Sequence, residues 1–120
     1  MTIEEIAGKL AFFHEQIHMI HWETRSFAEH KATGGFYEFL QDFKDDVIEK
    51  LMGYTGKRIQ SLKISPIMAK ADAMNVVDEV MKFSKDLEAY GDSNKFGDIS
   101  NLAQALSGEA AKMKYRLTLS

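Results

Sequence analysis

The chain has 120 residues and a formal net charge of −3 at pH 7, with a sequence pI near 5.8. Its hydrophobic residues, 45% of the total, suffice for one core, so we expect a single domain over residues 1–120. The absence of cysteine excludes disulfides and cysteine-ligated metal sites. No apolar run approaches the roughly 20 residues of a membrane span, and the start of the chain lacks the pattern of a signal peptide. We therefore expect a cytoplasmic protein without a membrane partner.

The first predicted helix covers about residues 3–24. Thr2 and Glu5 have the spacing of a capping box, in which the first side chain caps the helix that follows. Behind them, apolar residues recur every three or four positions, as on the buried face of a helix. These residues are Ile3, Ile6, Leu10, Phe13, Ile17 and Ile20.

The second predicted helix has two alternative starts. Ser26 and Glu29 form another capping box, but Gly34 and Gly35 follow within two turns. Each glycine inside a helix costs about 1 kcal/mol. The helix therefore either begins at Ser26 and bends at the glycines, or begins afresh near Phe36. Its apolar stripe consists of Phe36, Phe39, Leu40, Phe43, Val47 and Leu51.

The connection after this helix decides the topology. We expect the helix to end near Gly53 and Gly56, and residues 54–71, which include the single proline Pro66, to form the connection. A helix from Phe36 to Gly53 is about 27 Å long, and this connection can run back along it. If the helix instead continued to Leu62, the remaining residues could not span it, and the bundle would be simple up-down-up-down.

Two more helices are expected in the last part of the chain. The third covers about residues 72–90 and stops at Gly91, and the fourth is capped by Asp98. With almost no strand signal, four amphipathic helices predict an all-α four-helix bundle. The third stripe contains Val76, Val77, Val80, Met81, Phe83 and Leu87, and the fourth contains Ile99, Leu102, Leu106, Ala110, Met113 and Leu117.

All four histidines lie in the first quarter of the chain. At about 100° per residue, His14, His18 and His21 share one edge of the buried face, and His30 follows just beyond that helix. A histidine beside an apolar stripe is usually a hydrogen-bonded packing residue. Metal ligation is the alternative interpretation.

A row of carboxylates follows on the second helix: Glu38, Asp42, Asp45 and Glu49. Like charges at spacings of three and four repel, so the row indicates either a compensating cation or a solvated face. Asp45 and Glu49 point away from the stripe that faces the core, so they cannot simply share a site with His21 of the same chain. A site across a dimer interface removes this conflict, and it predicts at least a homodimer.

The order of these motifs resembles the Dps-type mini-ferritins. The resemblance rests on His21-Trp22, then His30, then Asp45-x-x-x-Glu49. It implies a ferritin-like four-helix bundle whose ferroxidase site takes His21 and His30 from one chain and Asp45 and Glu49 from its partner. The interval between the two histidines is about three residues shorter than is typical, and Gly34 stands where the family often has aspartate. Compact proteins of this kind are similar to those encoded by tailed phages.

The resemblance implies binding of iron, Fe(II) or Fe(III), or of another divalent metal, with Fe(II) oxidation as the expected chemistry. Asp42, Glu38 and His18 are further candidate ligands. The oligomer is at least a dimer, with a closed cage left open. The alternative is a non-catalytic dimerisation or scaffold module. Nucleic acid is not an expected partner, because the one basic cluster is small: Lys112, Lys114 and Arg116.

Overall fold

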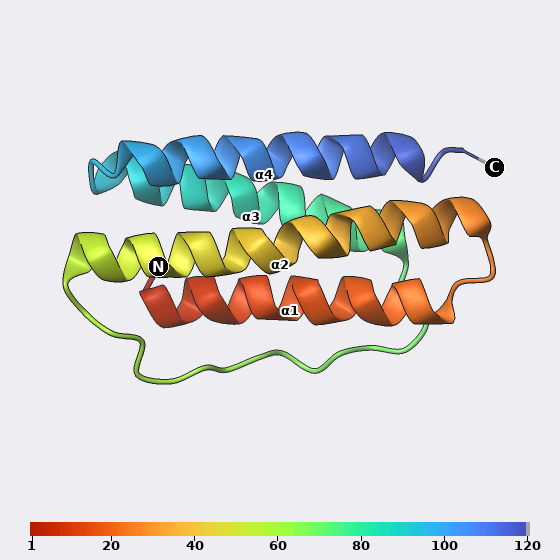
Figure 1. Cartoon of the computed structure of the whole chain (residues 1–120), viewed down its shortest axis with the longest axis horizontal. Coiled ribbons are helices and arrows are strands. Elements are labelled where there is room, and N and C mark those ends of the chain that lie inside the picture. The colour runs from red at the N-terminus through yellow and green to blue at the C-terminus, as the bar shows by residue number, and fades with distance from the viewer. Residues whose placement is uncertain (120) are drawn as a thin grey trace.

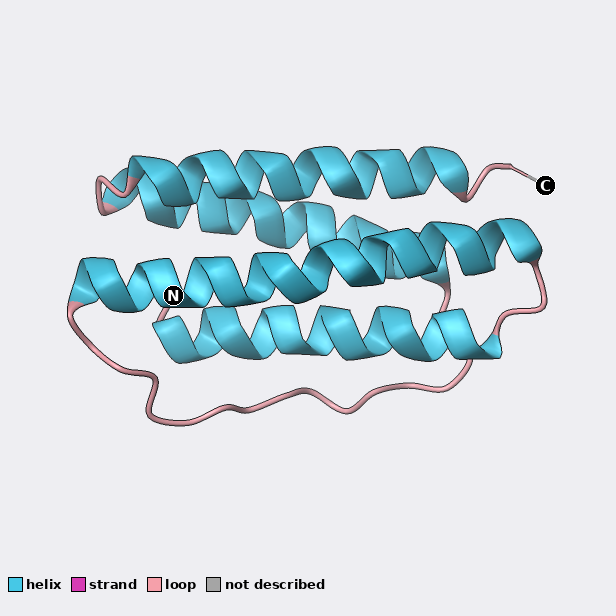
Figure 2. Cartoon of the chain, viewed as in Figure 1, coloured by secondary structure: helices cyan, strands magenta, loops and turns pink. Residues whose placement is uncertain are grey.

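The computed structural model describes residues 1–119, which form four helices and no strand (Figures 1 and 2). Within that range, none of the helices combines the length and the apolar composition needed to cross a lipid bilayer. The four helices, without any strand among the described residues, confirm the prediction of an all-α four-helix bundle. The helices are α1 (Ile3–Glu23), α2 (Phe27–Thr55), α3 (Ala73–Ser93) and α4 (Gly97–Arg116).

The topology has one long crossover. The pairs α1–α2 and α3–α4 are antiparallel hairpins with short turns, while residues 56–71 run back along the whole bundle, on the outer side of α1 (Figure 1). As a result, α3 starts at the end of the bundle where α2 starts. A single long crossover is the connection that ferritin-like bundles use. The predicted crossover is therefore confirmed, and the up-down-up-down alternative is wrong.

Local signals define most of the helix ends. Thr2, Ser26 and Asp72 each accept a hydrogen bond from the backbone N–H three residues later, at 3.1, 3.2 and 3.0 Å. The second helix thus begins after Ser26, and the alternative of a fresh start near Phe36 is wrong. Gly56, with φ of 68°, ends α2 in the left-handed conformation that favours glycine.

Two predicted helix ends were wrong. Gly91 does not stop the third helix but lies inside α3, where an added Cβ would meet the hydroxyl of Ser100 on α4. This glycine therefore allows two helices to approach closely. Asp98 does not cap α4, which begins after Phe96 without a side-chain cap. Instead, the Asp98 carboxylate lies 2.9 Å from the Lys50 ammonium of α2.

The core is built from the apolar stripes of the four helices. The largest fully buried side chains include Phe13 and Ile17 of α1, Leu40 of α2, Leu87 of α3 and Leu106 of α4. Burying side chains of this size contributes about 1.5–3 kcal/mol each relative to exposure. The helical period of the sequence therefore predicted the core-facing side of each helix correctly.

The crossover is fastened to α1 by side chains of that helix. We call residues 56–71 the crossover strap. An added Cβ on the buried Gly8 would collide with the backbone carbonyl of Lys63, so the strap lies directly against the helix there. Backbone groups of the strap also bind three side chains of α1: Glu4 to Gln60, Gln16 to Met68 and Glu23 to Lys70, at 2.8–3.1 Å.

Candidate functional site

His21 and His30 lie face to face where α1 and α2 meet at the hairpin turn. Their ring centroids are 3.8 Å apart with an interplanar angle of 19°. The Nδ1 atom of His21 lies 2.9 Å from the carbonyl oxygen of His30, and the Nδ1 atom of His30 lies 3.2 Å from the carbonyl oxygen of His21. The two residues are therefore joined by a reciprocal pair of hydrogen bonds.

These bonds determine which ring nitrogens carry the proton. A carbonyl oxygen can only accept, so Nδ1 donates in both rings. The hydrogen bonds of the Thr33 hydroxyl support this assignment. Its single proton is donated to the Glu29 carbonyl at 2.7 Å, so toward Nδ1 of His21, at 3.2 Å, the hydroxyl oxygen accepts. In the neutral rings, both Nε2 atoms therefore keep a lone pair. Metal-ligating histidines usually have this arrangement, with one nitrogen held by a carbonyl and the other free.

Gly34 makes room for one of the rings. A Cβ added to this glycine would lie 2.9 Å from Cε1 of His21. At the neighbouring Gly35, an added Cβ would meet only the end of the Arg116 side chain, at 3.4 Å. The imidazole of His21 therefore lies against the position where the mini-ferritin resemblance leads one to expect an aspartate.

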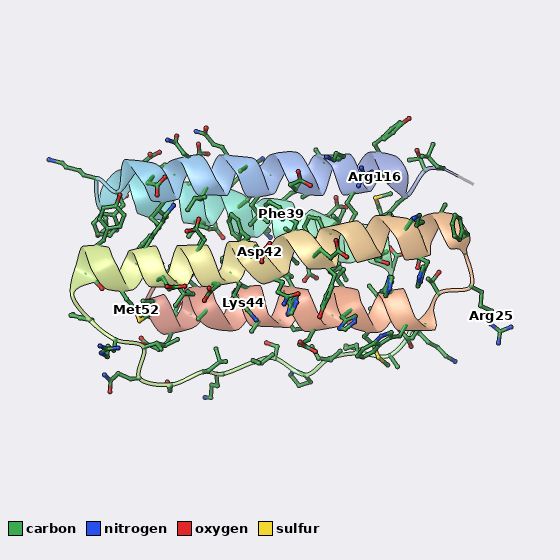
Figure 3. The ribbon with its side chains drawn as sticks, viewed as in Figure 1. Arg25, Phe39, Asp42, Lys44, Met52 and Arg116 are labelled. Atoms are coloured by element: carbon green, nitrogen blue, oxygen red, sulfur yellow. The ribbon has the colours of Figure 1, made fainter. Side chains whose placement is uncertain are left out.

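The two histidines line an open groove of about 650 Å³ at this end of the bundle. Glu38 is the carboxylate in its lining, and Lys31 and Arg116 are its cations. Figure 3 shows Arg116 at the C-terminal end of α4. The groove thus brings two imidazoles, one carboxylate and two cations to a single surface that is open to solvent.

The other two histidines take part in a stack of rings between α1 and α2. Tyr37 of α2 contacts His14 and His18 of α1, with ring centroids 4.4 and 3.8 Å away. Trp22 continues the stack, 3.9 Å from His18. His18 and His21 are separated by 6.1 Å between centroids. The predicted shared edge of the three helix-α1 histidines is therefore confirmed, and it faces α2.

His14 is the buried member of this stack. The residue is 7% exposed, and neither ring nitrogen has a hydrogen-bond partner among the described residues. The Glu15 carboxylate lies 3.4 Å from Nδ1 without forming a hydrogen bond. Burial lowers the pKa of His14 below its usual value of 6.5, the Lys44 charge lowers it further, and Glu15 opposes both. Figure 3 shows Lys44 on the side of α2 that faces α1.

The predicted carboxylates lie on the outer surface of α2, and all four are exposed. The neighbouring Asp45 raises the pKa of Glu49, because the two carboxyl groups can share a hydrogen bond only when one of them is protonated and because the Asp45 charge repels a Glu49 carboxylate. Among residues 1–119, no three histidine, aspartate or glutamate side chains converge so that they could hold a metal ion. One chain thus joins His21 and His30 but brings neither Asp45 nor Glu49 to them. We call Glu38, Asp42, Asp45 and Glu49 the acidic stripe.

Sequence reasoning missed two residues of this region, Thr33 and Tyr37. Both stand on α2 within two turns of His30, so helical spacing could have placed them near the histidines. Their contacts with α1 depend on how the two helices are aligned, which the period of one helix does not give. The small basic cluster at the end of α4 is largely paired, since Lys112 lies 3.7 Å from Glu109 and Lys114 lies 2.8 Å from Asp78.

The comparisons with known proteins overturn the assignment to the Dps-type mini-ferritins. An uncharacterized 14.6 kDa protein of Enterobacteria phage T4, from the mobD-ri intergenic region, is 26% identical over 84 residues. This alignment covers 70% of the chain and 66% of that relative, and no solved structure matches the chain. Histidines and acids at helical spacing are common on amphipathic helices, which explains the misleading motif match. Residues 21–117 match a family of unknown function, and the chain therefore belongs to that family, DUF5856.

Proposed function

We propose that this protein binds a divalent transition-metal ion through Nε2 of His21 and His30. The observation that supports the proposal is the reciprocal pair of Nδ1 hydrogen bonds, which leaves both Nε2 lone pairs free. Imidazole nitrogen suits zinc, copper, iron and nickel ions. Because the two ring planes are nearly parallel, at 19°, one ring has to turn out of the stack before both Nε2 atoms can bind the same ion.

Two imidazoles leave several coordination positions to other ligands. Glu38 lines the same groove and is the carboxylate best placed for this role, and water would occupy the rest. Iron is one candidate ion, and open positions of this kind are what oxidation of Fe(II) requires. Ligation by Asp45 and Glu49 of a second copy is not needed here, and it stays a prediction from the sequence.

The test is a titration of the protein with Co(II) and Zn(II), followed by optical absorption and by NMR of the ring nitrogens. Without metal, His21 and His30 should be protonated at Nδ1. Added Zn(II) should shift both Nε2 resonances. The changes His21→Ala and His30→Ala should each weaken metal binding at least about tenfold. Removing even a neighbouring group that only orients a metal-ligating histidine lowers metal affinity by about that factor.

His14→Phe is the matched control, because it also removes one histidine from α1 but leaves the His21–His30 pair unchanged. It should bind metal as the wild type does. If the titration leaves the Nε2 resonances unmoved, or if the control loses binding as much as His21→Ala does, the proposed site is wrong.

A second candidate function is a helical interaction module without chemistry. Its support is the exposure of two large aromatic side chains at the α1–α2 turn, Trp22 at 65% and Phe27 at 76%. In that case the reciprocal histidine bonds serve only to hold the hairpin closed. His21→Ala would then lower the melting temperature without any metal being bound. The similarity to a phage T4 protein supports a phage-encoded protein acting in the host cytoplasm in either case.

A further inference from the structure

A second open groove, of about 850 Å³, lies between α1, α3 and the crossover strap. It is separate from the histidine groove, because its α1 residues belong to the first half of that helix, from Glu4 to Phe13. Its volume lies within the range of about 300–1,000 Å³ that is usual for small-molecule sites. Such sites combine an apolar floor with a few polar groups, and this groove has both.

Three phenylalanine rings provide the apolar part of the lining. Phe12 and Phe13 of α1 meet edge to face with ring centroids 5.6 Å apart, and Phe13 meets Phe83 of α3 in the same way at 5.7 Å. Phe13 and Phe83 are buried in the core, so the packing of the bundle fixes this floor. Phe12 is half-buried, and an apolar group of a ligand can pack on its ring without any rearrangement of the core.

The crossover strap turns its polar side toward this groove. Ser61, Lys63 and Ser65 line the groove, whereas the intervening Leu62 and Ile64 do not and are 54% and 43% exposed. An extended segment that lies on a protein normally does the reverse, because apolar side chains gain free energy on burial. Two hydroxyl groups and one ammonium group therefore form a wall of the groove, and two apolar residues are left in water instead. This arrangement indicates that the groove takes a polar ligand.

The polar wall is held in position by contacts with α1. The Glu4 carboxylate accepts a hydrogen bond from the backbone N–H of Gln60 at 3.0 Å, and Gly8 allows the backbone of Lys63 to lie against the helix. Long connections without secondary structure are often functional when they are ordered. Because the wall is ordered before any ligand arrives, binding would cost little conformational entropy.

Charges of both signs line the groove without pairing with one another. On α3, Lys82 follows Glu79 by three residues and precedes Asp86 by four, which are the spacings of ion pairs on a helix. On α1, Glu5 and Lys9 are also four residues apart. None of these five residues takes part in an ion pair within residues 1–119. The groove therefore presents ammonium and carboxylate groups that a ligand can bind.

This mixture of charges selects the class of ligand. A purely anionic ligand, such as a phosphate, would be attracted by the lysines but repelled by the carboxylates of α1 and α3. A purely cationic ligand would meet the opposite conflict. A zwitterion satisfies both sets of charges at once, and the phenylalanine floor adds a place for an apolar side chain.

We propose that this groove binds a small amino-acid-type zwitterion with an apolar side chain, either a free amino acid or a short peptide. Lys63 and Lys82, with the hydroxyls of the strap, bind its carboxylate. Glu79 and Asp86 bind its ammonium group, and the apolar side chain packs on Phe12. The site uses no histidine, so it is independent of the proposed metal site.

The test is an NMR titration of the protein with L-phenylalanine and with the dipeptide leucyl-phenylalanine. Backbone amide signals of the groove residues should shift with at least one of the two, and the tighter of them identifies the source of the zwitterion. The N-acetylated and the C-amidated forms of that probe each lack one charge. Both should bind at least about tenfold more weakly, because each loses hydrogen bonds to charged groups. Glycylglycine, which has both charges but no apolar side chain, should also bind more weakly.

Two double variants assign the charges. Lys63→Gln with Lys82→Gln should weaken binding of the unmodified probe at least about tenfold but leave the amidated form unaffected, since that form has no carboxylate to lose. Glu79→Gln with Asp86→Asn should do the same for the unmodified probe and leave the acetylated form unaffected.

Each double variant has a matched control outside the groove. Lys57→Gln with Lys85→Gln removes two cations from the same two segments, and Asp42→Asn with Glu49→Gln removes two carboxylates from the acidic stripe. Both controls should bind as the wild type does.

Three results would overturn the proposal. One is the absence of any shift at about 10 mM of both probes, which is weaker than a specific site would bind. Another is equal binding of the acetylated, amidated and unmodified forms, or equal losses in the variants and their controls. The third is displacement of the probe by inorganic phosphate at an equal concentration, which would make the groove an anion site.

Discussion

The side chain of Gln16 pairs with both backbone groups of Met68, 52 residues later in the chain. Its amide nitrogen donates to the Met68 carbonyl at 2.9 Å, and its amide oxygen accepts from the Met68 N–H at 2.8 Å. This pair of hydrogen bonds between a buried side chain and an extended segment fixes where the crossover strap runs.

Gln16→Met should therefore loosen the strap while keeping the volume of the side chain. Loss of the two hydrogen bonds, at about 1 kcal/mol each, predicts a free energy of unfolding lower by about 2 kcal/mol. Limited proteolysis should cut residues 56–71 faster than in the wild type. The control Gln41→Met, at an exposed position of α2, should change neither quantity. Equal protease sensitivity of Gln16→Met and the wild type would contradict this account.

Gly8→Ala should destabilise the protein, although alanine normally favours a helix by about 1 kcal/mol over glycine. The reason is the collision of the new Cβ with the Lys63 carbonyl, which is backbone and cannot rotate away. Urea unfolding measures the effect. Gly108→Ala is the matched control, because nothing lies within 4 Å of its added Cβ, and it should stabilise the protein. Stabilisation by both changes would mean that the strap does not rest on α1 at this point.

Gly34→Ala should displace the ring of His21, since the added Cβ would lie 2.9 Å from Cε1. The expected results are a lower melting temperature and the loss of the Nδ1 proton signal that marks the bond from His21 to the His30 carbonyl. Gly35→Ala, one residue later, meets only the flexible end of Arg116 and should be neutral or stabilising. Identical spectra for these two variants would show that the ring does not lie against Gly34.

Acidification should destabilise the fold through His14. Burial lowers the pKa of His14, so the unfolded chain takes up a proton at a higher pH than the folded protein does. The stability contributed by the neutral ring is complete above its ordinary pKa of 6.5 and is lost as the pH falls below this value. Urea unfolding at about pH 7.5 and about pH 5.5 measures the loss.

The change His14→Phe tests this assignment, because phenylalanine can still stack on Tyr37 but cannot take up a proton. The variant should lose less stability than the wild type over the same pH interval. An equal loss would mean that other groups account for the acid sensitivity.

The mini-ferritin assignment failed for a reason that applies to short motifs in general. His21, His30, Asp45 and Glu49 have a suggestive order, but each is also an ordinary residue at the edge or on the surface of an amphipathic helix. The fold expectation did not depend on them, since it rested on the apolar stripes. For that reason the four-helix bundle was predicted correctly while the family was not, and the crossover followed from where the second helix ends.

Features that depend on nearby residues were readable from the sequence. The caps at Thr2, Ser26 and Asp72 join groups three positions apart, and the helical period alone identifies the buried side of each helix. The glycines could not be interpreted in this way, because Gly34 and Gly91 leave space for residues of a neighbouring helix, His21 and Ser100. The stacking of His21 on His30 and the binding of Gln16 to Met68 likewise join separate segments. Such contacts depend on how whole helices align, which only the packing of the complete core decides.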